Sequence, residues 1–201
     1  MALEERELRL AREAPLRAWR LFRVRVGTDD LVLSSPMYHD PDPTPWPETQ
    51  HTAVCYKGHP APAPACRCGI YGSIPGTLDS LPGYLLDTAY DEAPFVYAEI
   101  ACYGRVFVDV RGVRAEHAEL LRIALSTTSW PSAVEQADVE RQLGDRYRVL
   151  VGGLDEVPDW VIENQRTQGP PADEPALDLD ALDLRLDLVG GDGIEPPTSC
   201  L

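Results

Sequence analysis

The sequence predicts an α+β fold with a small, mostly antiparallel sheet, a long hairpin at about residues 95–123, short flanking helices and a zinc-stapled loop. Three observations lead to this prediction. Apolar residues recur at every second position of the hairpin region, a helix-start motif follows it, and four potential metal ligands lie within fourteen residues before it. We expect residues 1–166 to form a single globular domain that contains a zinc-type loop at residues 51–71.

The N-terminal part of the chain is predicted to contain one helix and two strands. Residues 2–14 favour a short helix, because a Glu and an Arg stand four positions apart and Pro15 follows. Residues 18–26 and 31–33 alternate between apolar and polar side chains, which is typical of strands with one face in water. Residues 35–51 contain five prolines and are expected to form a loop.

The hairpin is predicted from a long alternating segment. Even positions from Val96 to Val110 stay apolar through Gly104, which indicates one long strand. We expect Gly104 to mark a close approach of a bulky side chain or another backbone. A turn at Arg111 and Gly112 matches residues of like polarity or opposite charge across the strands. The predicted pairs are Val110 with Val113, Asp109 with Arg114, Val108 with Ala115, Val106 with His117, Cys102 with Leu121 and Ile100 with Ile123.

The C-terminal part of the domain is predicted to be mainly helical. A capping box at residues 132–135 begins a helix at residues 133–143, and Gly144 is the expected end of that helix. Residues 148–151 favour a short strand and residues 155–163 a second short helix.

The charge of the chain limits its partners. It has 33 acidic and 18 basic residues and a net charge of −15. Residues 167–201 hold eight of the acidic residues and one basic residue, so we expect an acidic, disordered C-terminal tail. Nucleic acid is not expected as a partner, because its binding rests on Lys and Arg. No signal segment or membrane span is visible, so we expect a cytoplasmic protein.

The metal-ligand cluster consists of Cys55, His59, Cys66 and Cys68. Zinc prefers four nitrogen or sulfur ligands in a tetrahedron, and glycines next to both ligand pairs allow the turns that would bring them together. The sequence therefore predicts a closed structural zinc site. Two alternatives stay open, namely buried or incidental thiols without a metal and a catalytic or redox site.

Other polar residues are weaker candidates for a site. His39 with Asp40 and Asp42 could bind a second metal, although a solvated loop explains them equally well. His51 and His117 could serve as general bases, although a surface or partly buried imidazole is the simpler interpretation of each. The sequence contains no phosphate-binding loop, nucleophile elbow or zinc-hydrolase motif.

Four motifs between about residues 19 and 122 resemble those of a group of uncharacterised actinobacterial proteins. They are HPAP at 59–62, CRCGIY at 66–71, YGRV at 103–106 and RGVRAE at 111–116. A Tyr at position 103 replaces the Trp that is usual in that group. The resemblance implies a soluble bacterial protein and no particular activity.

Residues 191–201 are similar to the translated antisense strand of a transfer-RNA T-arm. This similarity leads to the hypothesis that the gene belongs to a mobile element inserted at a transfer-RNA locus. An ordinary acidic tail with a chance match is the alternative.

Two functions follow from these features. The first is a non-enzymatic, zinc-stabilised module that binds another protein, because the ligand set is closed and no catalytic motif is present. The alternative is a thiol-based enzyme or redox sensor that uses Cys66 or Cys68 as a thiolate. The sequence does not indicate an oligomeric state.

Overall fold

The computed structural model describes residues 5–26, 30–35, 45–76, 95–125 and 133–166, and within them one mixed sheet of nine strands dominates. The strands are β1 (Arg6–Leu10), β2 (Leu16–Val26), β3 (Leu31–Ser34), β4 (Pro45–Trp46), β5 (Gln50–Thr52), β6 (Ile70–Gly72), β7 (Phe95–Asp109), β8 (Gly112–Leu125) and β9 (Leu150–Gly153). The helices are α2 (Ala133–Tyr147), the 3-10 helix η2 (Leu154–Glu156) and α3 (Asp159–Arg166).

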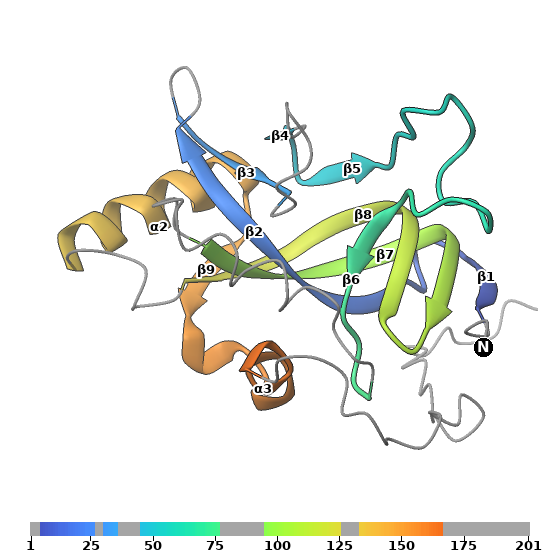
Figure 1. Ribbon diagram of the computed structural model, residues 1–201. Helices are drawn as coiled ribbons and strands as arrows, with labels where there is room; N and C mark the ends of the chain where they lie inside the picture. Colours follow the sequence, from blue (N-terminus) through green and yellow to red (C-terminus); the bar gives the residue numbers. More distant parts are fainter. Residues whose placement is uncertain (1–4, 27–29, 36–44, 77–94, 126–132, 167–201) are drawn as a thin grey trace, which may run out of the picture.

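The two longest strands, β7 and β8, form the centre of the sheet (Figure 1). The main order is β4-β3-β2-β7-β8-β5, with β1 also paired to β7, and with β6 and β9 also paired to β8. Every pair is antiparallel except β8 with β9. The predicted fold is therefore confirmed in part: the described residues are mostly strands with flanking helices, and the sheet is mixed, with nine strands.

The β7–β8 hairpin is present, but the predicted register is wrong. The turn lies at Val110 and Arg111, and the Asp109 carboxylate stabilises it by accepting a hydrogen bond of 2.8 Å from the Arg111 amide. Gly112 is consequently the first residue of β8 rather than part of the turn. The observed pairs include Val108 with Val113, Phe107 with Arg114, Val106 with Ala115, Tyr103 with His117, Cys102 with Ala118, Ile100 with Leu120 and Ala98 with Ile123.

A bulge at Gly104 explains part of this change in register. The pairing shifts between Tyr103 and Val106, and Gly104 has a φ of +77° that favours glycine. A Cβ atom at this position would lie 2.8 Å from Cδ2 of His117. The predicted close approach at Gly104 is therefore confirmed. A second irregularity between Glu99 and Ile100 shifts the register again.

The predicted N-terminal helix is wrong, because residues 6–10 form strand β1. Leu8 pairs with Val106 and Leu10 with Gly104, and both leucines pack against the core. The period of two in the segment RELRL puts its leucines on one face, and the free edge of β7 gives this short segment a hydrogen-bonding partner. Tertiary pairing thus outweighs the local preference for a helix.

The predicted loop at residues 35–51 is partly wrong as well. Residues 36–44 lie outside the described residues, but the strands β4 and most of β5 fall within this range. Trp46 pairs with Leu33 and is 4% exposed, and its ring packs edge-on against Phe22 at a centroid distance of 5.0 Å. Burial of this large aromatic side chain fixes β4 on the sheet.

The helices end later than predicted. α2 continues through Gly144 to Tyr147, whose buried hydroxyl accepts a hydrogen bond from the Leu33 amide and donates one to the Trp46 carbonyl, each 2.8 Å long. Arg148, with a φ of +54°, then redirects the chain into β9. The predicted short strand and second helix are present, displaced by two to four residues. Ser132 of the predicted capping box lies outside the described residues.

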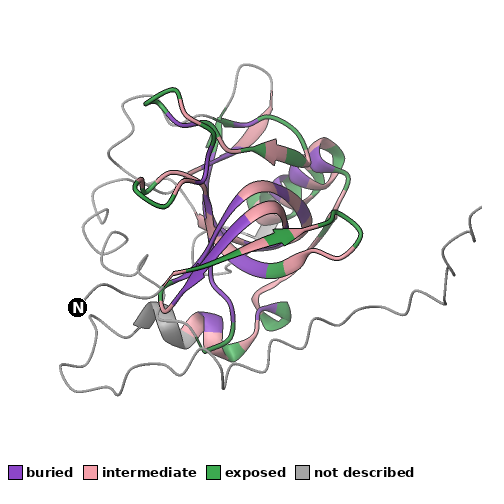
Figure 2. Ribbon diagram, turned by 90° about the vertical axis from the view of Figure 1, so that its right-hand side faces the viewer, coloured by how far each residue is buried: buried purple, intermediate pink, exposed green. Residues whose placement is uncertain are grey.

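The hydrophobic core lies against both faces of the hairpin, and Figure 2 shows buried residues along the middle of the sheet. Ile123 belongs to the main cluster, which includes Leu143 of α2, whereas the adjacent Ala124 packs with Val161 of α3. Because adjacent strand residues point to opposite faces, α2 and α3 cover opposite faces of the sheet.

Some predictions concern residues that the structure does not describe. The tail at residues 167–201, including the segment 191–201, lies outside the described residues, as do His39, Asp40 and Asp42. Among the described residues, no helix is both long and apolar enough to span a membrane.

Candidate metal centre

The four predicted ligands lie in one loop, residues 53–69, which we call the metal loop. It connects β5 and β6, and both of these strands pair with β8 at positions two residues apart, Thr52 with His117 and Ile70 with Ala115. A hydrogen bond of 2.7 Å from the Ala53 amide to the Glu116 carbonyl closes the base of the loop. The sheet therefore holds both ends of the metal loop at one place.

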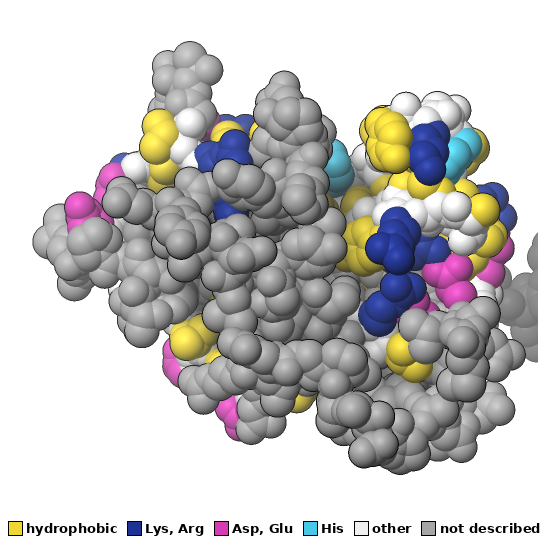
Figure 3. All heavy atoms as spheres, in the orientation of Figure 1, with side chains coloured by type: hydrophobic (Ala, Val, Ile, Leu, Met, Phe, Trp, Pro, Cys, Tyr) yellow, Lys and Arg dark blue, Asp and Glu magenta, His cyan; other side chains and the backbone are white. Residues whose placement is uncertain are grey.

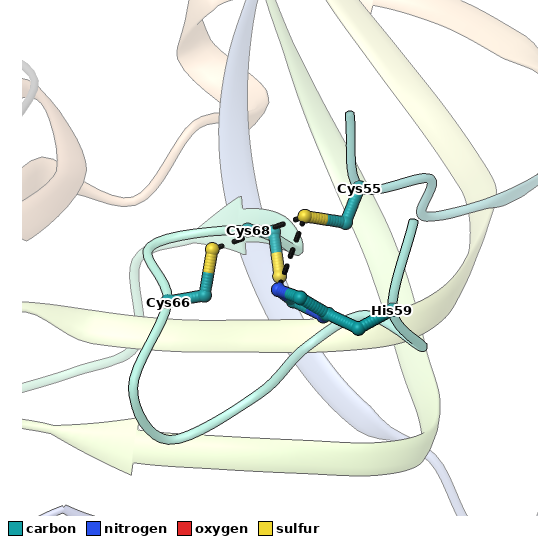
Figure 4. Close-up of side chains that lie close together, drawn as sticks. All are labelled: Cys55, His59, Cys66 and Cys68. Atoms are coloured by element: carbon teal, nitrogen blue, oxygen red, sulfur yellow. Dashed lines mark hydrogen bonds between the residues drawn. The ribbon is translucent and has the colours of Figure 1, made fainter. Parts of the chain in front are cut away.

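The ligand atoms of Cys55, His59, Cys66 and Cys68 all lie within 4.8 Å of one another. Figure 4 shows their side chains gathered around a shared centre. The prediction that these four residues come together is confirmed, and their arrangement could hold a metal ion.

Two of the distances match a tetrahedral zinc site closely. Sulfur atoms about 2.3 Å from one zinc ion would lie about 3.8 Å apart, and a sulfur and an imidazole nitrogen would lie about 3.6 Å apart. The Sγ atoms of Cys55 and Cys66 are 3.8 Å apart, and the Cys55 Sγ is 3.3 Å from the His59 Nε2. The ligands therefore need only small movements to coordinate one ion.

Two tight turns place the ligand pairs. The Gly58 amide donates to the Cys55 carbonyl at 2.9 Å, and Gly58 has a φ of +76° that favours glycine. The Lys57 amide also donates a hydrogen bond of 3.4 Å to the Cys55 Sγ. The Cys68 backbone likewise donates a hydrogen bond to the thiol of Cys66, which lies two residues before it, as Lys57 does to Cys55. Amides that point at sulfur in this way stabilise thiolates.

Arg114 of β8 fastens the metal loop to the sheet. Its Nη1 donates to the carbonyls of Cys66 and of Cys68, the latter at 3.1 Å. Its Nε and Nη2 bind the Glu5 carboxylate, and the side chain is 9% exposed. The sequence does not predict this role, because its hairpin pattern pairs Arg114 with Asp109, whereas Asp109 forms an ion pair with Arg111. No local pattern indicates that a β8 arginine binds loop carbonyls.

The electrostatics of the cluster favour one ionised thiol. Burial raises the pKa of Cys66, but hydrogen bonds from the Cys68 backbone and from the side chains of His59, Cys68 and Cys55 outweigh it and lower the pKa to about 6. Burial, and next the hydrogen bond to Cys66, raises the pKa of Cys68 to about 11. The hydrogen bond to the Pro60 carbonyl raises the pKa of His59. A bound cation would favour loss of the remaining thiol protons.

The remaining cysteine and histidines of the described residues do not join this cluster. Cys102 is fully buried in β7, and burial raises its pKa to about 12, as expected of an unreactive core thiol. His51 stacks on Trp46 at a centroid distance of 4.7 Å. Burial, and next the charge of Arg20, lowers the pKa of His51.

His117 stacks on Tyr103 at a centroid distance of 5.2 Å, and its Nδ1 lies 3.0 Å from the Thr52 hydroxyl. Like His51, it is held by an aromatic ring of the sheet. Neither imidazole belongs to the cluster of thiols found among the described residues.

Comparison of the chain with protein-family models, curated proteins and solved structures found no match. The resemblance to actinobacterial proteins therefore stays a prediction.

Proposed function

We propose that this protein is a non-enzymatic protein-interaction module in which a structural zinc ion closes the metal loop. The convergence of Cys55, His59, Cys66 and Cys68 within 4.8 Å supports this proposal most directly. Four protein ligands fill a tetrahedral site and leave no position for the water that a hydrolytic zinc site needs.

The ligand types favour zinc over the other common metal ions. Three thiolates and an imidazole are soft or borderline donors, whereas Mg²⁺ and Ca²⁺ prefer oxygen. Zinc accepts the Cys₃His set in a tetrahedron without redox chemistry. Structural zinc contributes binding free energy on the order of 10 kcal/mol to small zinc domains, so an ion here would stabilise the loop substantially.

Exposed side chains at the metal loop support a protein partner. Val54 and Tyr56, the neighbours of Cys55, are 86% and 91% exposed. Tyr is enriched in the cores of protein interfaces, where it combines a large apolar ring with a polar group. The net charge of −15 argues against a phosphate backbone as the alternative partner.

Metal content tests the proposal. The purified full-length protein should contain one zinc per chain by elemental analysis. Cys66→Ser should lose the zinc, whereas the matched control Cys102→Ala, which removes a thiol outside the cluster, should keep it. Equal zinc content in both variants, or no zinc in the wild type, would contradict a structural zinc site.

A second candidate, a thiol-based enzyme or redox sensor, is supported by the pKa of about 6 at Cys66. The rate of alkylation separates the two functions. If zinc binds the thiols, iodoacetamide should react slowly with Cys66 and Cys68 until a chelator is added. If Cys66 acts as a free thiolate, it should react rapidly at neutral pH with or without the chelator.

A further inference from the structure

A hollow lies beside the metal loop, on the side facing the tip of the hairpin. It has a volume of about 430 Å³, and its lining combines residues 64–67 of the metal loop, Glu5, Tyr71 of β6, and Asp109, Arg111 and Arg114 of the hairpin. Figure 3 shows Lys and Arg side chains gathered on the right-hand side of the view, over the metal loop and the neighbouring strands. Three arginines and two carboxylates give the lining a positive excess on a chain whose net charge is −15.

The three arginines differ in how many of their donors are in use. Each guanidinium nitrogen of Arg114 already has a partner, because Nε and Nη2 bind Glu5 and Nη1 binds the loop carbonyls. Asp109 holds Arg111 through Nε at 3.0 Å and through Nη2, and Nη1 has no partner among the described residues. Arg111 is therefore oriented by the protein and still has a free donor.

Arg67 is exposed, and its guanidinium makes no hydrogen bond or ion pair within the described part of the chain. It stands between Cys66 and Cys68, so closure of the metal loop determines where its backbone lies. A second cation, with unused donors in the described part of the chain, thus lines the same hollow as Arg111. Paired guanidinium groups recognise oxyanions, above all carboxylates and phosphates.

We propose that this hollow is an anion-binding site in which Arg67 and Arg111 bind carboxylate side chains of an acidic segment of a partner protein. The choice of a protein segment rests on the proposed function as an interaction module. The anion site itself rests on the hollow and its free donors. Because metal closure positions Arg67, metal binding and peptide binding strengthen each other.

The test measures binding of a fluorescein-labelled hexaglutamate peptide to the full-length protein by fluorescence anisotropy. Hexaglutamine is the uncharged control peptide. The wild type should bind hexaglutamate at least about tenfold more tightly than hexaglutamine, because charge-assisted hydrogen bonds are the stronger kind. Arg67→Ala should weaken hexaglutamate binding about tenfold, and Arg111→Lys should weaken it less because the charge remains.

The control variant is Arg25→Ala, which removes an exposed arginine on β2, outside the hollow. It should change hexaglutamate affinity less than about twofold. All three variants should keep the metal content of the wild type, measured on the same samples. Equal losses in Arg67→Ala and Arg25→Ala, or equal affinity for the two peptides, would overturn the proposal.

Competition separates a peptide ligand from a small oxyanion. Citrate and inorganic phosphate should displace hexaglutamate only at concentrations well above the dissociation constant of hexaglutamate. Displacement below that concentration would assign the hollow to a small oxyanion and overturn the peptide assignment. If the protein contains no zinc but Arg67→Ala still loses peptide binding, the zinc proposal fails and the anion site remains.

Discussion

The sheet and the metal loop are stabilised in different ways. Most side chains of β7 and β8 are buried, so the hydrophobic effect stabilises the hairpin. In the metal loop, residues 53–69, only Cys55, Ala61 and Pro62 are buried, and polar contacts with the sheet hold the chain. The comparison indicates that the sheet can fold through its own core, whereas the loop depends on its ligands.

Removal of a ligand should have the largest effect, and it should be confined to the loop. We expect Cys66→Ser to increase amide hydrogen exchange in residues 53–69 by about 100-fold or more, because the loop has little apolar burial to keep it closed. Exchange in β7 should stay unchanged. Mass spectrometry of exchanged peptides measures both regions. An equal increase in the exchange rate of β7 would show that the loop and the sheet open together.

Removal of a core side chain should affect the whole chain instead. Ile123 is fully buried in the hairpin, so Ile123→Ala should lower the free energy of unfolding by about 2–5 kcal/mol. The control Leu150→Ala, at a side chain that is 81% exposed, should stay within about 0.5 kcal/mol of the wild type. Urea denaturation measures both values. A loss below about 1 kcal/mol for Ile123→Ala would contradict the assigned core.

Removal of the Arg114 side chain, which connects the metal loop to the sheet, should have an intermediate effect. Arg114→Ala removes the donors to the loop carbonyls and leaves Glu5 without its partner. Because Glu5 is partly exposed to water, we expect a loss of about 2–3 kcal/mol rather than the full cost of a buried unpaired charge. Arg17→Ala, at an exposed arginine paired to Glu99, should cost at most about 1 kcal/mol. Equal unfolding free energies for the two variants would show that the contacts of Arg114 do not stabilise the metal loop.

The bulge at Gly104 should give the smallest effect. Gly104→Ala places a side chain at a φ of +77° and brings its Cβ near His117, so we expect a cost of about 1–2 kcal/mol. Thermal unfolding followed by circular dichroism measures it, with Gly58→Ala as the comparison. Gly58 has a similar φ but open space around it, so its substitution should cost less. The reverse order would argue against a close approach at Gly104.

The sequence predicted those features that depend on neighbouring residues. The apolar alternation of β7 is local, and the four metal ligands lie within fourteen residues, so both could be read from the chain. Features that depend on distant partners were missed. The pairing of residues 6–10 with β7, the bulge opposite Glu116 and the contacts of Arg114 with loop carbonyls all join segments far apart in the sequence. Local propensity carries no information about such partners.

X-ray absorption at the zinc K-edge of the purified protein tests the central claim most directly. We predict three sulfur ligands at about 2.3 Å and one nitrogen ligand at about 2.0–2.1 Å, with no oxygen in the coordination shell. His59→Ala should leave three sulfurs and lose the multiple-scattering signal of the imidazole ring. A shell without three sulfur ligands, or an equally strong imidazole signal in wild type and His59→Ala, would contradict closure of the loop by these four residues.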